Sequence, residues 1–321
     1  VRFVLIKYLV VFQVTTLYYH HSDFLFHETG VGHPECPERL VSIASALENS
    51  NFSSLIRVPA PLGNELQIRL VHSQVHVEAI IKAAPKQGYY YLDQDTVLST
   101  GSTQAAFRAV GAVCDAVDRV VSGEANNAFC AIRPPGHHAE VDLAMGFCLF
   151  NNVAIATEYA RQYHQINRIA IIDFDVHHGN GTQAIFFNQP NVLYVSSHEL
   201  FNYPGTGSPK EIGLGNIINV PLFEGDTGIE FREKYSKIIL PALRDFKPEI
   251  LLISAGFDAH RDDSLGSIML LEDDFEWVTK QLMCIADSYC KGRIISVLEG
   301  GYNLKALASS VAIHIKTLMN H

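Results

Sequence analysis

The stretch Ile171-Ile172-Asp173-Phe174-Asp175-Val176-His177-His178-Gly179-Asn180-Gly181 decides both the fold and the site of this chain. A run of β-forming residues, 168–172, leads directly into two acids and an imidazole at alternate positions. Alternate side chains of an extended chain point to the same side, so Asp173, Asp175 and His177 are expected to face together. With no thiolate nearby, this donor set favours a borderline divalent ion such as Zn²⁺ and leaves a position for water. In the alternative interpretation, the acids cap the next helix and the histidines are satisfied polar residues. That interpretation would suit one Asp, but the whole array favours a metal.

Strand and helix signals alternate along most of the chain. The expected strands are 15–19, 128–132, 168–174, 192–197, 250–255 and 293–298, and the expected helices are 40–47, 102–123, 153–163, 230–243 and 273–289. This alternation predicts an α/β fold with a mainly parallel sheet and helices on both faces. No repeat or linker divides the 321 residues, which are 48% hydrophobic. We therefore expect a single catalytic domain over 15–321, preceded by a leader or extension over 1–14.

Composition narrows the class of protein. The six cysteines are scattered without a C-x-x-C pair, which argues against a disulfide scaffold and favours a cytoplasmic location. The formal charge of −10 argues against direct nucleic-acid binding, which needs clustered Lys and Arg, and suits cationic substrates. Residues 1–14 are apolar but are interrupted by Arg2 and Lys7. They are too short to span a membrane and lack a small-residue cleavage site, so a targeting role is the weaker interpretation.

Reactive residues follow four of the expected strands. His137-His138 lies after 128–132, the Asp173-x-Asp175-x-His177 array at the end of 168–174, Asp258 after 250–255, and Tyr302 after 293–298. In open α/β sheets ligands bind beyond the carboxyl ends of the strands, so these loops are expected to converge. Asp175, His177 and Asp258 then form a three-ligand metal site with an open position, although Asp258 alone could be a helix cap.

The same loops carry the groups needed for hydrolysis. We expect His138 to take a proton from water and return it to an amine, and His137 to tune the local field. Asp173 would orient the rings by holding their far nitrogens. Tyr302, on the Gly300-Gly301 turn, could hydrogen-bond an oxyanion, or could instead be a wall aromatic. Arg39, after a proline-rich turn, is either a buried organiser of the site wall or a surface ion-pair partner, and the sequence favours the surface.

Five segments together resemble the zinc-dependent histone deacetylase family. They are Arg133-Pro-Pro-Gly-His-His-Ala-Glu140, Met145-Gly-Phe-Cys-Leu-Phe-Asn-Asn152, Asp173-Phe-Asp-Val-His-His-Gly-Asn-Gly-Thr-Gln183, Ser254-Ala-Gly-Phe-Asp258 and Leu298-Glu-Gly-Gly-Tyr302. The resemblance is dense from about His33 to the last helix. It is closest to class II enzymes and to bacterial histone deacetylase-like amidohydrolases. Asn180 stands where class I members have an Asp beside the catalytic His, which agrees with class II.

The resemblance implies an arginase-deacetylase fold, one catalytic Zn²⁺ and structural K⁺ ions. It assigns zinc to Asp175, His177 and Asp258, and catalysis to His137, His138 and Tyr302, with Asp173 and Asn180 behind them. The potassium ligands it implies are Asp173, Asp175, His177, Ser196 and Ser197 for an inner ion, and the carbonyls of Phe186, Gln189 and Val192 for an outer one. The substrate tunnel it implies is formed by Phe147, Tyr203, Leu265, Gly300 and Gly301, with Asp93 or Asp95 at the rim. Tyr203 replaces the usual Phe.

Removal of acetyl or other acyl groups from lysine side chains of proteins or peptides is the leading hypothesis. Hydroxamate-type inhibitors should bind such a site, and acids expected near the mouth would favour basic peptides unless they are merely solvated. These acids are Glu140, Asp142, Asp262 and Asp263.

Deacetylation of polyamines is the alternative, disfavoured because Leu265 stands where polyamine-specific relatives have an acid. The Asp-x-Asp-x-His order argues against a two-metal ureohydrolase. A non-catalytic acyl-lysine binding protein is a third possibility, and the physiological metal could be Fe²⁺. The sequence leaves the oligomeric state open.

Overall fold

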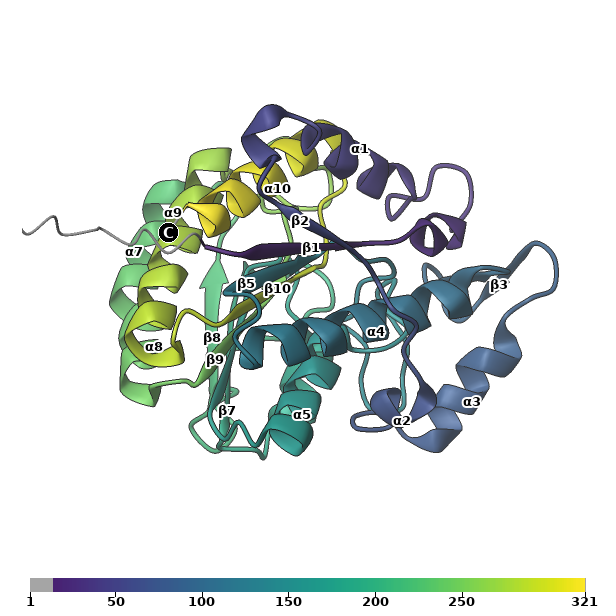
Figure 1. The fold of residues 1–321 in the computed structure, drawn as a ribbon, viewed down its shortest axis with the longest axis horizontal. Coiled ribbons are helices and arrows are strands. Elements are labelled where there is room, and N and C mark those ends of the chain that lie inside the picture. The colour runs from purple at the N-terminus through teal and green to yellow at the C-terminus, as the bar shows by residue number, and fades with distance from the viewer. Residues whose placement is uncertain (1–13, 321) are drawn as a thin grey trace, which may run out of the picture.

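An eight-stranded sheet lies at the centre of the computed structural model, which describes residues 14–320 (Figure 1). The strands lie in the order β2-β1-β5-β10-β9-β6-β7-β8, and every neighbouring pair is parallel. Their bounds are β1 Thr16–His20, β2 Ile56–Pro59, β5 Asn127–Cys130, β6 Ile169–Asp173, β7 Val192–Glu199, β8 Ile217–Leu222, β9 Ile250–Ala255 and β10 Ile294–Leu298. The predicted α/β fold is confirmed. Apart from Val14, the predicted leader lies outside the described residues.

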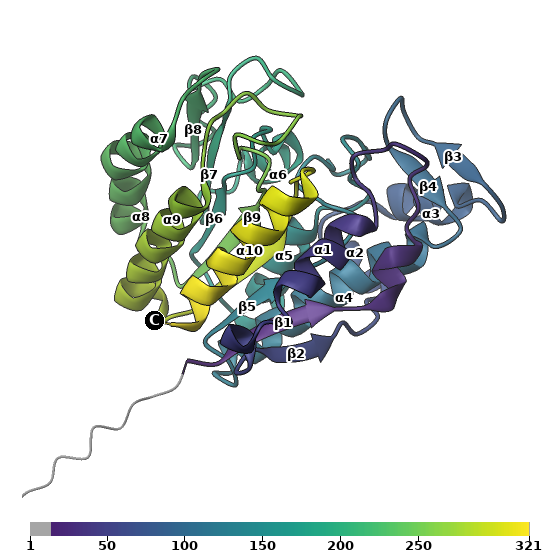
Figure 2. The same cartoon turned by 90° about the horizontal axis from the view of Figure 1, so that it is seen from above.

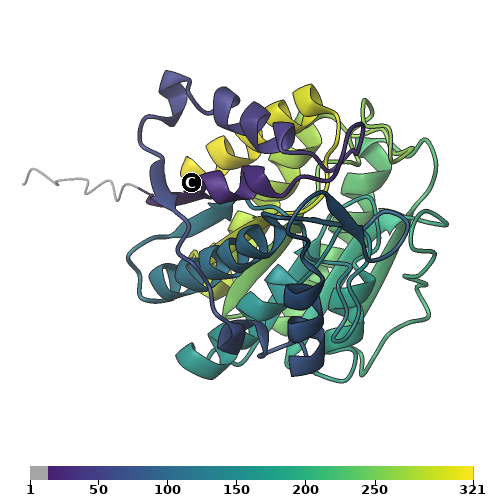
Figure 3. The ribbon, with the colours of Figure 1, turned by 90° about the vertical axis from the view of Figure 1, so that its right-hand side faces the viewer.

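Helices cover both faces of this sheet (Figures 2 and 3). One layer consists of α1 Glu38–Ala46, α7 Gly228–Lys234, α8 Leu240–Phe246, α9 Glu272–Ile285 and α10 Leu304–Met319. The opposite layer is built mainly from α4 Ser102–Val121 and α5 Asn152–His164, with α2 Glu65–Ile68 and α6 Asn180–Phe186 packed beside them. Helix α3 Gln74–Ala83 and an antiparallel hairpin, β3 Tyr89–Tyr91 with β4 Val97–Ser99, extend to one side (Figure 1). None of the helices within residues 14–320 combines the length and the apolar character needed to cross a bilayer.

The central strands bring the reactive loops to one edge. Every residue of β5, β6, β9 and β10 is buried, as expected for parallel strands covered on both faces. Asp173, the last residue of β6, is in register with Ser254 near the end of β9, and Leu298 at the end of β10 is in register with Ala255. Because these carboxyl ends are level, the segments that follow them share one rim of the sheet.

The structure differs from the sequence-based expectations at the periphery. The edge strands β2 and β8 were not predicted; β2 is short and mostly exposed, and so lacks a buried periodic pattern. Tyr89–Tyr91, which lies in none of the expected strands, forms β3. The expected helix 102–123 is α4, which ends two residues earlier, and the hydroxyl of its first residue, Ser102, accepts a hydrogen bond from the Ser99 amide at 2.7 Å.

Candidate active site

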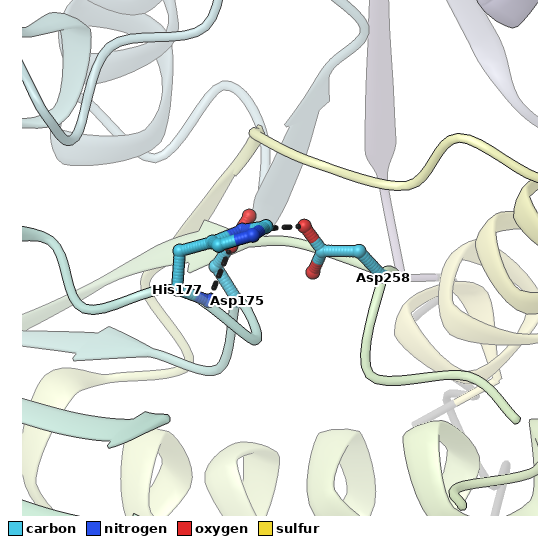
Figure 4. A group of neighbouring side chains, drawn as sticks. All are labelled: Asp175, His177 and Asp258. Carbon is cyan, nitrogen blue, oxygen red and sulfur yellow. Dashed lines mark hydrogen bonds and ion pairs between the residues drawn. The ribbon is translucent and has the colours of Figure 1, made fainter. Parts of the chain in front are cut away.

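Asp175, His177 and Asp258 meet at the rim of the sheet, although Asp258 comes from a loop about 80 residues further along the chain (Figure 4). The His177 ring nitrogen Nδ1 lies 3.0 Å from Asp175 Oδ1 and 3.2 Å from Asp258 Oδ2. One donor atom from each residue lies within 4.8 Å of the other two, and all three residues are buried. Strand β6 ends at Asp173, so the loop after the strand, rather than strand alternation, places Asp175 and His177.

The charges of this cluster suit a divalent cation. Burial, and then the negative charge of Asp175, raise the pKa of Asp258 to about 7, and its buried Oδ2 faces the His177 ring at 3.2 Å without a main-chain donor. Burial alone would lower the pKa of His177, but its hydrogen bonds to Asp175 and Asp258 raise it well above the ordinary value. The proton on the His177 ring thus compensates the negative charges of the two buried carboxylates only in part. A divalent ion in place of that proton would satisfy all three groups, and this donor set suits Zn²⁺.

Main-chain amides hold the two carboxylates in position. Asp175 Oδ2 accepts from the Gly300 amide at 2.8 Å, and Asp258 Oδ1 accepts from the Val176 amide at 2.9 Å. A Cβ atom on Gly300 would collide with the carboxylates of both Asp258 and Asp175. Gly300 is therefore a packing requirement of the cluster.

His137 and His138 lie beside this cluster, with ring centroids 4.0 Å apart and ring planes tilted by 45°. His137 Nδ1 lies 3.1 Å from Asp173 Oδ2, and its Nε2 lies 3.9 Å from Asp175 Oδ1. Burial alone would lower the pKa of His137, but the charges of Asp173 and Asp175 raise it to about 10. Burial, and then the positive charges on His137 and His177, lower the pKa of His138 well below its ordinary value. The two rings therefore take opposite protonation states at neutral pH.

The tautomer of His138 follows from its partner. Asn180 Nδ2 donates to Glu140 Oε1 at 3.0 Å, so Asn180 Oδ1 is the acceptor that faces His138 Nδ1 at 2.9 Å. In neutral His138 the proton is then on Nδ1, and Nε2 keeps a free lone pair.

Glu299 is a buried acid beneath the histidine loop that the sequence analysis did not assign. Its Oε2 accepts from the amides of Gly136 and His137 at 2.7 and 3.2 Å, and its Oε1 accepts from the Ser254 hydroxyl at 3.1 Å. Burial, opposed by the charge of His137, raises the pKa of Glu299 to about 7. Glu299 therefore links the loop after β5 to the carboxyl ends of β9 and β10.

Tyr302 is positioned by one contact to its main-chain amide and another to its ring. Asp263 Oδ2 accepts from the Tyr302 amide at 2.6 Å, and Asp263 is buried, so the expectation that this acid faces the mouth is wrong. The Arg39 guanidinium lies 5.0 Å from the Tyr302 ring centroid, and its Nε donates to the Gly301 carbonyl at 2.7 Å. Arg39 is fully buried, so the favoured surface role is also wrong and the buried organiser is confirmed.

The buried charge of Arg39 is paired with the carboxylate of Glu35, which also pairs with Arg133. Arg39 Nη1 donates to Glu35 Oε1 at 2.9 Å, and Arg133 Nη2 donates to Glu35 Oε2 at 2.7 Å. Burial alone would raise the pKa of Glu35, but the charges of Arg133 and Arg39 hold it well below its usual range. All three side chains are fully buried, and Glu35 and Arg133 are 98 residues apart in the chain.

We expect Glu35→Gln to lower the free energy of unfolding by about 3–5 kcal/mol, because it leaves two buried guanidinium groups with no anion. Urea unfolding followed by tryptophan fluorescence and circular dichroism would measure this loss. Glu276→Gln is the matched control, since Glu276 pairs with Lys280 on the exposed surface of α9 and should cost less than about 1 kcal/mol. Equal losses in the two variants would contradict a structural role for the buried triad.

A cavity of about 210 Å³ opens above His138 and His177. Phe147, Tyr203 and Leu265 line it, together with Tyr302 and Asp95. Three of the five predicted tunnel residues therefore lie in its wall, while Gly300 and Gly301 act through their main chains beneath it. Asp93 instead turns back on its own loop, accepting from the Asp95 amide at 2.9 Å. Of the two rim candidates, Asp95 is thus the one at the cavity.

Ser196 and Ser197, two of the residues predicted to bind the inner potassium ion, lie on β7 beside Asp173. Asp173 is in register with Ser196 of β7. The Ser196 hydroxyl lies 2.8 Å from His198 Nδ1 and the Ser197 hydroxyl 3.1 Å from the Tyr235 hydroxyl. The inner potassium site stays a prediction. The carbonyls of Phe186, Gln189 and Val192 all face the side chain of Asn216.

A parallel α/β sheet with a buried Asp–His–Asp group and a histidine pair at its carboxyl edge has the organisation of an α/β hydrolytic enzyme. The histone deacetylase domain model matches residues 33–318, and the chain belongs to the histone deacetylase family. It is therefore a hydrolase of the deacetylase and amidohydrolase type, as the sequence resemblance predicted.

Relatives and a solved structure agree with this assignment. The chain is 42% identical over 305 residues to the Synechocystis protein slr0245, covering 94% of this chain and 98% of that protein. It is 37% identical to a histone deacetylase-like amidohydrolase of Pseudomonas aeruginosa, covering 85% and 73%, and 38% identical to the chloroplastic histone deacetylase 10 of Oryza sativa, covering 87% and 68%. The crystal structure of the HDA15 HD domain superposes with a TM-score of 0.91 at 34% identity, over 96% of this chain and 89% of that one. The predicted arginase-deacetylase fold is thereby confirmed.

Proposed function

We propose that residues 15–321 form one catalytic domain that hydrolyses acetyl and related acyl groups from lysine side chains of proteins or peptides. The observation that carries the proposal is the cavity in which Phe147 and Tyr203 form aromatic walls above His138 and His177. A slender apolar chain with a polar amide at its tip, as in acyl-lysine, fits such a channel. Hydroxamate-type inhibitors should bind there for the same reason. One relative is named as a chloroplastic protein. The cytoplasmic location of this chain therefore stays a prediction.

Asp175, His177 and Asp258 would hold one Zn²⁺ or Fe²⁺ ion, which supplies Lewis-acid polarisation of the acyl carbonyl when bound. His138 acts as general base and then general acid. Its lowered pKa keeps it neutral, and the Asn180 contact leaves Nε2 free to accept a proton from the attacking water. After the amide breaks, the same nitrogen returns that proton to the leaving lysine amine.

His137 and Tyr302 stabilise the charge that develops. His137 is held as an imidazolium between Asp173 and Asp175, so it adds a fixed positive charge beside His138. Burial, and then the charge of Asp258, keep the pKa of Tyr302 well above its ordinary value. The phenol therefore stays protonated and can donate a hydrogen bond to the oxyanion. Asp95 at the cavity mouth would accept hydrogen bonds from the substrate main chain.

Lysine is preferred over polyamine because Leu265 is apolar where it lines the cavity. An acidic side chain there would attract the second amine of a polyamine, whereas a leucine attracts none. A non-catalytic acyl-lysine binding protein is the weaker candidate, since the histidine pair, the Asp–His–Asp group and Tyr302 all surround one cavity.

The test is hydrolysis by the metal-loaded chain of an acetyl-lysine peptide, a longer acyl-lysine peptide and an acetylated polyamine, measured side by side. We expect the highest kcat/KM on the acetyl-lysine peptide. Leu265→Glu is the diagnostic variant, and it should shift the ratio of kcat/KM values towards the polyamine by about tenfold or more, since one added charge contact is worth over about 1.4 kcal/mol. If the folded, metal-loaded wild type releases no acetate from any lysine substrate, the proposal fails.

A further inference from the structure

Three main-chain carbonyls, from the last residue of α6 to the first residue of β7, converge on one nitrogen atom. The Asn216 Nδ2 atom lies 2.9 Å from the Phe186 oxygen, 3.1 Å from the Gln189 oxygen and 2.9 Å from the Val192 oxygen. A ring of carbonyl oxygens around one point is a typical environment for a monovalent cation. These are also the three carbonyls that the family resemblance assigns to an outer potassium ion. In this chain an amide nitrogen is at the centre of the ring.

The orientation of that amide is determined by its other end. Asn216 Oδ1 accepts a hydrogen bond from the Leu214 amide at 3.0 Å. A main-chain amide can only donate and three carbonyls can only accept, so the flipped arrangement would lose four favourable contacts. The side chain is also buried, with 4% exposed. The hydrogen bonds at both ends of the Asn216 amide therefore fix its nitrogen among the three carbonyls.

The carbonyls themselves have little need of an ion. The Phe186 oxygen also accepts from the Gln189 amide at 3.0 Å, and the Gln189 oxygen from the Val192 amide at 2.9 Å. The two hydrogens of the Asn216 amide supply the remaining donors, one of them shared between two oxygens. A cation touching all three oxygens would need the space that Nδ2 occupies.

We propose that the Asn216 side chain replaces the outer potassium ion in this chain. The amide joins the carboxyl end of α6 and the start of β7 to β8, which begins at the next residue, Ile217. A covalently attached donor does this at any salt composition, whereas a bound ion does so only when its concentration exceeds its dissociation constant. The turn over residues 186–192 is therefore independent of potassium.

Crystals of the wild type and of Asn216→Ala, soaked in thallous or rubidium ions, test this directly. We expect no anomalous peak among the Phe186, Gln189 and Val192 carbonyls in the wild type, and a peak there in Asn216→Ala, where the side chain no longer fills the ring. A peak among these carbonyls in the wild type, with the Asn216 amide turned away, would overturn the proposal. That measurement needs no variant to fold.

Thermal unfolding in potassium chloride and in tetramethylammonium chloride of equal ionic strength gives a second readout. Asn219→Ala is the matched control, because Asn219 is a buried amide on β8 whose Nδ2 contacts Gln183 Oε1 at 2.7 Å and not the ring. Any inner potassium site adds the same increment to all three proteins. We expect Asn216→Ala to gain roughly 1–3 °C more from potassium than the other two, the shift that one regained interaction gives in a domain of this size. If potassium raised the unfolding temperature equally in all three proteins and Asn216→Ala showed no anomalous peak, the carbonyl ring would have no affinity for a cation. The Asn216 side chain would then replace no ion, and the proposal would fail.

Discussion

His138→Ala is expected to lower kcat on an acetyl-lysine peptide by about 10²- to 10⁴-fold, the range in which a positioned general acid–base contributes. The reason is geometric and electrostatic: His138 lines the cavity, and its depressed pKa keeps Nε2 available as a base. The variant should keep its fold and its metal content, because His138 is outside the Asp–His–Asp cluster. Steady-state kinetics with the metal content determined on the same sample would measure the effect.

His314→Ala is the matched control for that experiment. His314 is an equally buried imidazole with two partners, the Thr279 and Ser296 hydroxyls at 2.6 and 2.9 Å, on α10 and away from the cavity. It should lower stability while leaving kcat of the folded fraction unchanged. Tyr302→Phe is the companion variant and should cost about 10²- to 10³-fold, as the loss of one oxyanion donor does elsewhere. Wild-type rates in both His138→Ala and Tyr302→Phe would show that the assigned roles are wrong.

Asp258→Ala is expected to abolish high-affinity binding of the divalent ion and, with it, detectable deacetylation. Asp258 supplies a buried carboxylate oxygen, Oδ2, that has no main-chain donor and faces the His177 ring at 3.2 Å, and its removal leaves only two protein ligands. Elemental analysis after gel filtration should find one zinc or iron ion per chain in the wild type and none in the variant. A chelator should likewise inactivate the wild type, and added Zn²⁺ should restore it.

Asp262→Ala controls for the loss of an acid from the same loop. Asp262 is largely exposed, with 59% of its side chain accessible, and pairs with Arg261. It should keep both the metal and the activity. Retention of one ion per chain by Asp258→Ala would mean that the cluster is not the metal centre.

The sequence was sufficient for the parts of the site that follow β-forming runs. Each of the segments 128–132, 168–172, 250–255 and 293–298 has a local apolar signal, and the rule that ligands bind at the carboxyl ends of parallel strands brings their loops together. The prediction that His137, Asp175, Asp258 and Tyr302 share one rim depended only on that rule. Their individual roles remain proposals, but their convergence is a property of the structure.

The sequence did not predict which charged side chains are buried. Arg39 follows two prolines and two glutamates, which is also the composition of a solvated turn, and so the sequence favours the surface interpretation. Its real environment depends on Glu35, Arg133 and the carbonyls of residues about 260 positions away. Asp263 was misplaced for the same reason, since the amide that it holds belongs to Tyr302.

The amino-acid sequence by itself determined the α/β class, the kinds of donor atoms at the site and the strands that deliver them, because apolar periodicity and residue type are local properties. Only the tertiary structure decided which acids meet a histidine, which arginines are buried, and that Asn216 occupies a ring of carbonyls. The physical reason is that the pKa and the hydrogen bonds of a side chain depend on the groups within a few ångströms of it. In a parallel sheet with the order β2-β1-β5-β10-β9-β6-β7-β8, those groups come from segments far apart in the chain.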